Sequence, residues 1–180
     1  MKKYMDPLAV TMANLGVSPN LISILGLLFA FISGLMFLYR RLILAFCFIL
    51  LSGFFDVLDG AVARASGSSS SFGAFFDSML DRISDFLIIS SILYASLCTL
   101  EWGILALAGS FLVSYARARG EALGVEMSGV GIAERAERLI ILALGSLLNL
   151  IEWAIIAIAI LTLLTVTIRF YKVWIELRET

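Results

Sequence analysis

Four aspartates in two close pairs are the residues of this sequence best suited to chemistry. Asp56 and Asp59 are three positions apart, and Asp77 and Asp81 are four apart, so each pair lies on one face of a helix. A glycine also lies on each of these two helix faces, which lets the backbone approach a bound ligand. Crowded carboxylates repel one another and take up protons unless cations neutralise them. Because every candidate ligand atom is an oxygen, the pattern predicts a hard divalent ion, namely Mg²⁺, Mn²⁺ or Ca²⁺.

Two such cations held side by side could clamp a pyrophosphate. They would stabilise the oxygens that enter and leave during an in-line displacement at phosphorus. The alternative is structural, with the aspartates pairing with Arg64 and Arg82 in a buried network. Ionisable groups in membrane segments are costly and usually functional, which favours the metal site.

The chain that must position these carboxylates is unusually apolar. Of its 180 residues, 61% are hydrophobic and 15% are charged, and the mean hydropathy is +1.03. Soluble domains have an apolar fraction nearer to half, so this composition indicates a membrane protein. A net charge of -1 argues against a nucleic-acid partner, and the absence of His gives a zinc site little support.

Charge-free runs predict six transmembrane helices. Only the first reaches the 18-residue threshold, so the others must continue into their polar ends to cross a bilayer. The predicted fold is an all-α integral membrane protein, a single domain over residues 1–180, with a short interfacial amphipathic helix at Lys2 to Met12 before the six spans. The runs are 21–39, 42–55, 86–100, 102–116, 139–151 and 153–168.

The distribution of Lys and Arg predicts the orientation. Antiparallel packing of neighbours brings the polar helix ends to one side, which holds most of the basic residues, against Arg40 and Arg41 on the other. The positive-inside rule assigns that side to the cytosol. We therefore expect a protein of the cytoplasmic membrane whose site faces the cytosol.

A second polar cluster lies at the predicted end of the fourth span and the start of the fifth. The stretches 114–121 and 133–138 contain several arginines, which suit bidentate binding of a phosphate group on a substrate. The alternative is that these arginines anchor helix ends at the membrane surface and pair with nearby glutamates. The residues alone leave both interpretations open.

The aspartate pattern resembles the signature of the CDP-alcohol phosphotransferase family. The resemblance implies a reaction in which an alcohol attacks the phosphorus of a CDP-activated donor and CMP is released. It also implies a homodimer. The positions that match are Asp56, Asp59, Gly60, Ala63, Arg64, Gly73, Asp77 and Asp81.

The resemblance also implies roles for these residues. Asp56, Asp59, Asp77 and Asp81 would hold two Mg²⁺ ions, or Mn²⁺ in their place, and Asp81 would also be the general base. The nucleotide pocket would be lined by Gly60, Ala63, Arg64 and Gly73, together with Asp56, Asp59 and Asp77.

The second cluster looks like the branch of the family that uses inositol phosphate. That resemblance places Ser114, Arg117, Arg119, Arg138 and Arg169 at the acceptor phosphate. The expected donor is a CDP-activated lipid carrying diacylglycerol or archaeol. Glycerol 3-phosphate as acceptor, CDP-inositol as donor, and a cation transporter using the aspartates as an ion path are the alternatives.

Small residues in the predicted spans are expected to serve helix packing. Ser23, Ser33 and Ser52, with the glycines at 26, 34 and 53, are assigned to close contacts between helices and to no chemistry. Asp85, one turn beyond Asp81, could extend the acidic face or pair with Arg82 or with an arginine of the second cluster, and it receives no catalytic role.

Overall fold

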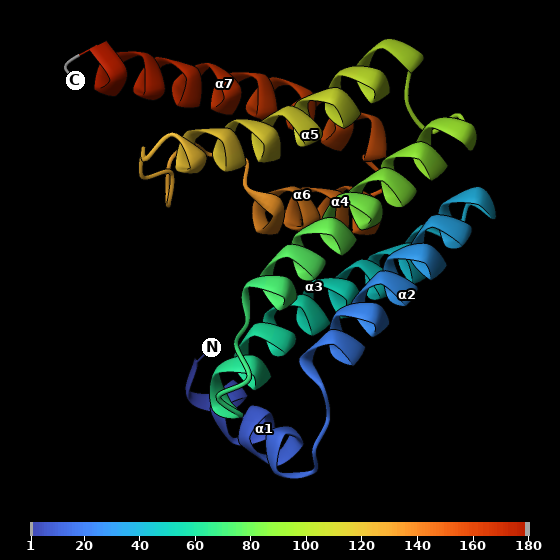
Figure 1. The fold of residues 1–180 in the computed structure, drawn as a ribbon. Coiled ribbons are helices and arrows are strands. Elements are labelled where there is room, and N and C mark those ends of the chain that lie inside the picture. Colours follow the sequence, from blue (N-terminus) through green and yellow to red (C-terminus); the bar gives the residue numbers. More distant parts are fainter. Residues whose placement is uncertain (1, 179–180) are drawn as a thin grey trace.

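The computed structural model describes residues 2–178, and its regular structure there is helical. Seven helices follow one another along the chain (Figure 1). They are α1 (Lys2–Asn14), α2 (Pro19–Leu38), α3 (Leu42–Ala65), α4 (Ser71–Tyr94), α5 (Leu100–Ala122), α6 (Arg135–Leu147) and α7 (Ile151–Arg178).

Side-chain caps fix where two of the helices near the polar end begin. Ser18 Oγ accepts from the Leu21 amide at 3.3 Å at the start of α2, where Pro19 occupies the first turn. Ser70 Oγ accepts from the Gly73 amide at 3.0 Å at the start of α4. At the opposite end of the bundle, Arg40, Ser96 and Asn149 adopt positive φ angles in the three turns there.

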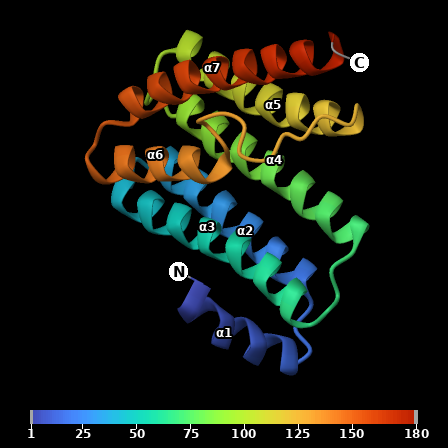
Figure 2. The same ribbon diagram turned by 90° about the vertical axis from the view of Figure 1, so that its left-hand side faces the viewer.

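The helices form two groups bridged by α6. In Figure 1, α2, α3 and α4 run diagonally beside one another, while α5 and α7 lie together above them. Figure 2 shows α6 between α3 and α7, and α1 against the far side of α3. A continuous core of buried isoleucines, including Ile49, Ile88, Ile92, Ile155 and Ile158, joins the two groups.

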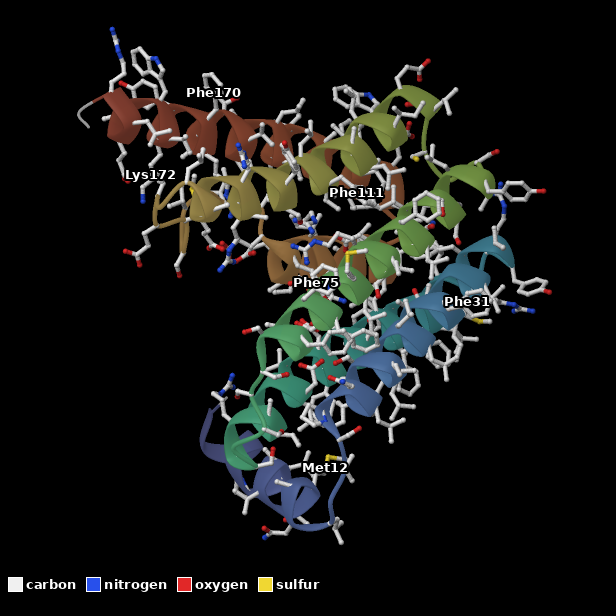
Figure 3. The ribbon with its side chains drawn as sticks, viewed as in Figure 1. Met12, Phe31, Phe75, Phe111, Phe170 and Lys172 are labelled. Atoms are coloured by element: carbon white, nitrogen blue, oxygen red, sulfur yellow. The ribbon has the colours of Figure 1, made fainter. Side chains whose placement is uncertain are left out.

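The outer surface of the bundle is apolar. Phe31 on α2, Phe75 on α4 and Phe170 on α7 project from it (Figure 3), and each is exposed. Within residues 2–178, three helices are long and apolar enough to cross a membrane: α2, α3 and α7. A membrane environment accounts for this surface, since soluble monomers rarely expose such large apolar patches.

Two of the expected spans differ from the helices found. The run 139–151 is interrupted, because α6 ends at Leu147 and α7 begins at Ile151. With 13 residues, α6 is about 20 Å long, shorter than the hydrocarbon core of a bilayer. The run 86–100 also contains a turn, because α4 ends at Tyr94 and α5 begins at Leu100.

Candidate active site

Three of the predicted aspartates meet where α3, α4 and α6 converge. Asp56, Asp77 and Asp81 each offer a carboxylate oxygen, and these atoms lie within 4.8 Å of one another. Arg135, the first residue of α6, forms ion pairs with Asp56 and with Asp81, the latter at 2.6 Å from Nη1 to Oδ1. The spacing of the aspartates predicted this cluster, whereas nothing in the sequence linked Arg135 to it.

The cluster fits a hard divalent cation. Its donors are carboxylate oxygens on two rigid helices, all three residues are partly buried, and their proximity matches the ligand set that Mg²⁺ or Mn²⁺ takes. Arg135 supplies a positive charge beside them, so the carboxylates are not left without a counter-charge.

The fourth aspartate has a separate partner. Asp59 is buried and accepts a hydrogen bond from Ser23 Oγ on α2 at 2.5 Å. Ser23, assigned to helix packing, does join α2 to α3, and it does so through a carboxylate of the predicted metal site. Ser23 lies three residues before Gly26, which packs against α3, but only the structure shows which side of α2 faces α3.

A cavity of about 400 Å³ opens beside Asp59. It lies between α3, the starts of α2 and α4, and the loop before α4. Of the residues predicted to bind CDP, it is lined by Asp59, Gly60, Ala63, Arg64, Gly73 and Asp77, but Asp56 is not among its lining residues.

The cavity has features that favour a phosphate-bearing ligand. The amino-terminal ends of α2 and α4 border it, and helix amino termini attract anions. A Cβ at Gly73 would lie 3.2 Å from Ser70 Oγ and 3.7 Å from Asn20 Oδ1, so a side chain there would crowd the wall. Asn20 and the serines at 68–70 also line this cavity, and none of them was predicted to bind the nucleotide.

A second cavity of about 400 Å³ lies on the other side of the acidic cluster. Its walls come from α4, α5, α6 and α7. Of the residues predicted to bind the acceptor phosphate, it is lined by Ser114, Arg117, Arg138 and Arg169. Arg119 is exposed on α5 and is not among the lining residues.

The arginines of this second cavity are held by specific partners. Arg138 Nη2 lies 2.5 Å from Asp85 Oδ2, so of the alternatives for Asp85 the structure shows pairing with an arginine of the second cluster. Arg169 is buried and donates to the carbonyls of Val113 and Val130 and to Glu134. These bonds tie α7 to α5 and to the segment before α6.

The two cavities share one lining residue. Asp77 borders both, and Asp81 borders the second. Two ligands, one bound in each cavity, would therefore meet at the carboxylates of the cluster. This arrangement suits transfer of a group from one bound molecule to another.

The family model for CDP-alcohol phosphatidyltransferases matches residues 16–167, from just before α2 into α7. The chain belongs to this family. Among relatives, archaetidylinositol phosphate synthase of Pyrococcus horikoshii is 38% identical over 96% of this chain and 92% of its own length. Phosphatidylinositol phosphate synthase of Mycobacteroides abscessus is 30% identical over 95% and 84%.

Solved structures of the family share this fold. Phosphatidylinositol phosphate synthase of Mycobacterium tuberculosis with CDP-DAG bound matches with a TM-score of 0.83 and 29% identity, covering 96% of this chain and 94% of that one. The same protein has been solved with manganese and citrate, again with a TM-score of 0.83, covering 94% and 88%. The family resemblance predicted from the aspartate pattern is confirmed, and with it the assignment to a transferase.

Proposed function

We propose that this protein transfers the phosphatidyl-type group of a CDP-activated lipid to inositol phosphate, releasing CMP. The observation that carries the proposal is the acidic cluster lying between two cavities, one bordered by helix amino termini and the other by arginines. Relatives named for the synthesis of archaetidylinositol phosphate and phosphatidylinositol phosphate support the acceptor. The bound CDP-DAG of the tuberculosis enzyme supports the donor.

The aspartates of the site would bind the metal ions. Asp56, Asp59, Asp77 and Asp81 would hold two divalent cations, Mg²⁺ or Mn²⁺. The manganese complex of the tuberculosis enzyme supports a divalent metal, and the proximity of Asp56, Asp77 and Asp81 supports its place. When bound, such ions neutralise the carboxylates and polarise pyrophosphate oxygens.

Asp81 would serve as the general base. It borders the arginine-lined cavity, so its carboxylate can accept the proton of an acceptor hydroxyl. The hydroxyl oxygen attacks the phosphorus that bears the lipid. The bond from that phosphorus to the CMP oxygen breaks, and CMP leaves.

The two cavities would bind the two substrates. Gly60, Ala63, Arg64, Gly73, Asp59 and Asp77 would surround the nucleotide. Ser114, Arg117, Arg138 and Arg169 would face the acceptor phosphate. Arg119, on the same helix as Ser114 and Arg117, does not line this cavity, so we assign it no direct contact with the acceptor phosphate.

The apolar surface supports a membrane arrangement for the whole chain. We propose that α2 to α7 form six spans, in which the short α6 crosses the bilayer together with the chain segments that flank it. We also propose that α1 lies in the interface and that residues 1–180 are one domain. The protein would lie in the cytoplasmic membrane with its active site facing the cytosol, since most basic residues lie at the polar end of the bundle that holds the site. We also propose that the protein forms a homodimer, as the family resemblance implies.

A substrate panel tests the function. Purified protein in a nonionic detergent is given Mg²⁺, then CDP-diacylglycerol, CDP-archaeol or CDP-inositol, each with inositol phosphate, glycerol 3-phosphate or free inositol. We expect CMP release with a CDP-lipid and inositol phosphate, and the donor comparison identifies the lipid. Turnover only with glycerol 3-phosphate or only with CDP-inositol would reject the proposed pair, and no CMP release with any pair would reject the activity.

A further inference from the structure

Five arginines border the second cavity, and they differ in how firmly protein carboxylates hold them. Four have a carboxylate oxygen within 3.1 Å: Arg117 with Glu121, Arg135 with Asp81, Arg138 with Asp85, and Arg169 with Glu134. The fifth is Arg82 on α4. An anion that enters the cavity must compete with an ordered carboxylate at the first four.

Arg82 is bound differently. Its Nη1 donates to the carbonyl of Ser78 at 2.5 Å, and its nearest carboxylate oxygen, on Asp81, lies 3.7 Å away. Across the described part of the chain, its Nε and Nη2 have no hydrogen-bond partner. The side chain is 28% exposed, so these donors are accessible from the cavity without lying in bulk solvent.

Resting on the proposed function, we infer that Arg82 binds the phosphate of the acceptor. An Arg–phosphate contact is charge-assisted and directional, and the donors of Arg82 are available for it without breaking a short ion pair. The ligand class is a phosphate monoester carried by the soluble alcohol.

The position of Arg82 also gives the contact a geometric consequence. Arg82 follows Asp81 directly, and both border the same cavity. A phosphate held by Arg82 would keep the rest of the acceptor within reach of the Asp81 carboxylate. Arg82 would thus orient the attacking hydroxyl toward its base, which makes it a determinant of acceptor specificity.

Steady-state kinetics of Arg82→Gln and Arg82→Lys test the inference. Losing a hydrogen-bonded charge contact weakens binding by about 10- to 100-fold. We therefore expect Arg82→Gln to raise the acceptor KM by at least about tenfold while the KM of the CDP-lipid stays unchanged. The acceptor KM of Arg82→Lys should fall between those of the wild type and of Arg82→Gln, because lysine keeps the charge and loses the planar guanidinium.

Arg41→Gln is the matched control, since Arg41 is an exposed arginine at the opposite end of α3 from Asp56. It removes the same charge from the protein and should leave both KM values unchanged. Thermal unfolding of each variant, followed in the same detergent, checks that the fold is kept.

The outcomes separate the possible sources of the phosphate. If Arg82→Gln raises the KM of the CDP-lipid, or changes only the response to added anionic lipid, Arg82 contacts a lipid phosphate and the inference is wrong. An unchanged acceptor KM in an enzyme that turns over inositol phosphate overturns the inference and leaves the proposed function intact. If the wild-type enzyme uses glycerol 3-phosphate instead, the proposed acceptor fails, and the same KM comparison with that acceptor still decides the role of Arg82.

Discussion

Arg138 and Asp85 form a buried ion pair that joins α6 to α4, with Nη2 and Oδ2 2.5 Å apart. Both side chains are almost completely buried, at 4% and 7% exposed. Arg138 also donates to the carbonyl of Ala133, so its guanidinium is fixed at the wall of the second cavity. Asp85 thereby positions a residue that we place at the acceptor phosphate.

Replacing Asp85 by Ala should destabilise the protein strongly. The change leaves the Arg138 charge buried without its partner, and breaking such a pair costs about 3–5 kcal/mol of unfolding free energy. Thermal unfolding in detergent measures the loss. The double replacement Asp85→Leu with Arg138→Met should recover much of the stability and still bind the acceptor poorly.

The double variant distinguishes a positioning role from a purely structural one. If it recovers both stability and the wild-type acceptor KM, the pair serves only the fold. Recovery of stability with a raised acceptor KM supports the role of Arg138 in binding.

Replacing Ser23 by Ala should weaken metal binding. Ser23 donates to Asp59 at 2.5 Å, and hydrogen bonds to the ligands of a metal commonly change its affinity by about 10- to 100-fold. Titration of Mn²⁺ followed by electron paramagnetic resonance measures that affinity directly. Ser33→Ala is the matched control, because Ser33 is also buried on α2 and donates to the Ala45 carbonyl instead. Equal Mn²⁺ affinity in the two variants would remove Ser23 from the metal site.

The sequence predicted what depends on the local geometry of single helices. The spacing of Asp56 and Asp59, and of Asp77 and Asp81, places each pair on one face whatever surrounds the helix. The family-specific pattern at these positions then gave the enzyme class. The family comparisons confirm that class.

The sequence could not predict which polar groups pair between helices. Asp85 and Arg138 are 53 positions apart, and Ser23 and Asp59 are 36 apart, so their contacts depend on how the helices rotate and tilt. Hydropathy located the turn after α6 only approximately. Leu148 and Leu150 are as apolar as the residues of α6, and it is the positive φ of Asn149 that turns the chain after this helix.

Replacing Asp81 by Asn should lower kcat far more than it weakens donor binding. The amide keeps the size of the side chain but loses the basic oxygen and one ligand charge, and loss of a general base typically costs about 10²–10⁴-fold in rate. Single-turnover release of CMP measures the chemical step, and calorimetry with CDP measures nucleotide binding. Loss of CDP binding with an unchanged rate at saturation would contradict the role of base.

Replacing Gly109 by Ala should loosen the contact between α5 and α7. A Cβ at this position would overlap the Thr162 hydroxyl and lie 2.8 Å from its Cβ, and Thr162 is fully buried. Overpacking of this kind costs about 1–3 kcal/mol, so we expect a lower Tm. The control is Gly53→Ala on α3, where the added Cβ would lie 3.5 Å from Leu139, an ordinary contact. Because alanine favours a helix over glycine, that control should keep or raise the Tm. Equal Tm values in the two variants would show that α5 and α7 can separate at Gly109 without loss of stability.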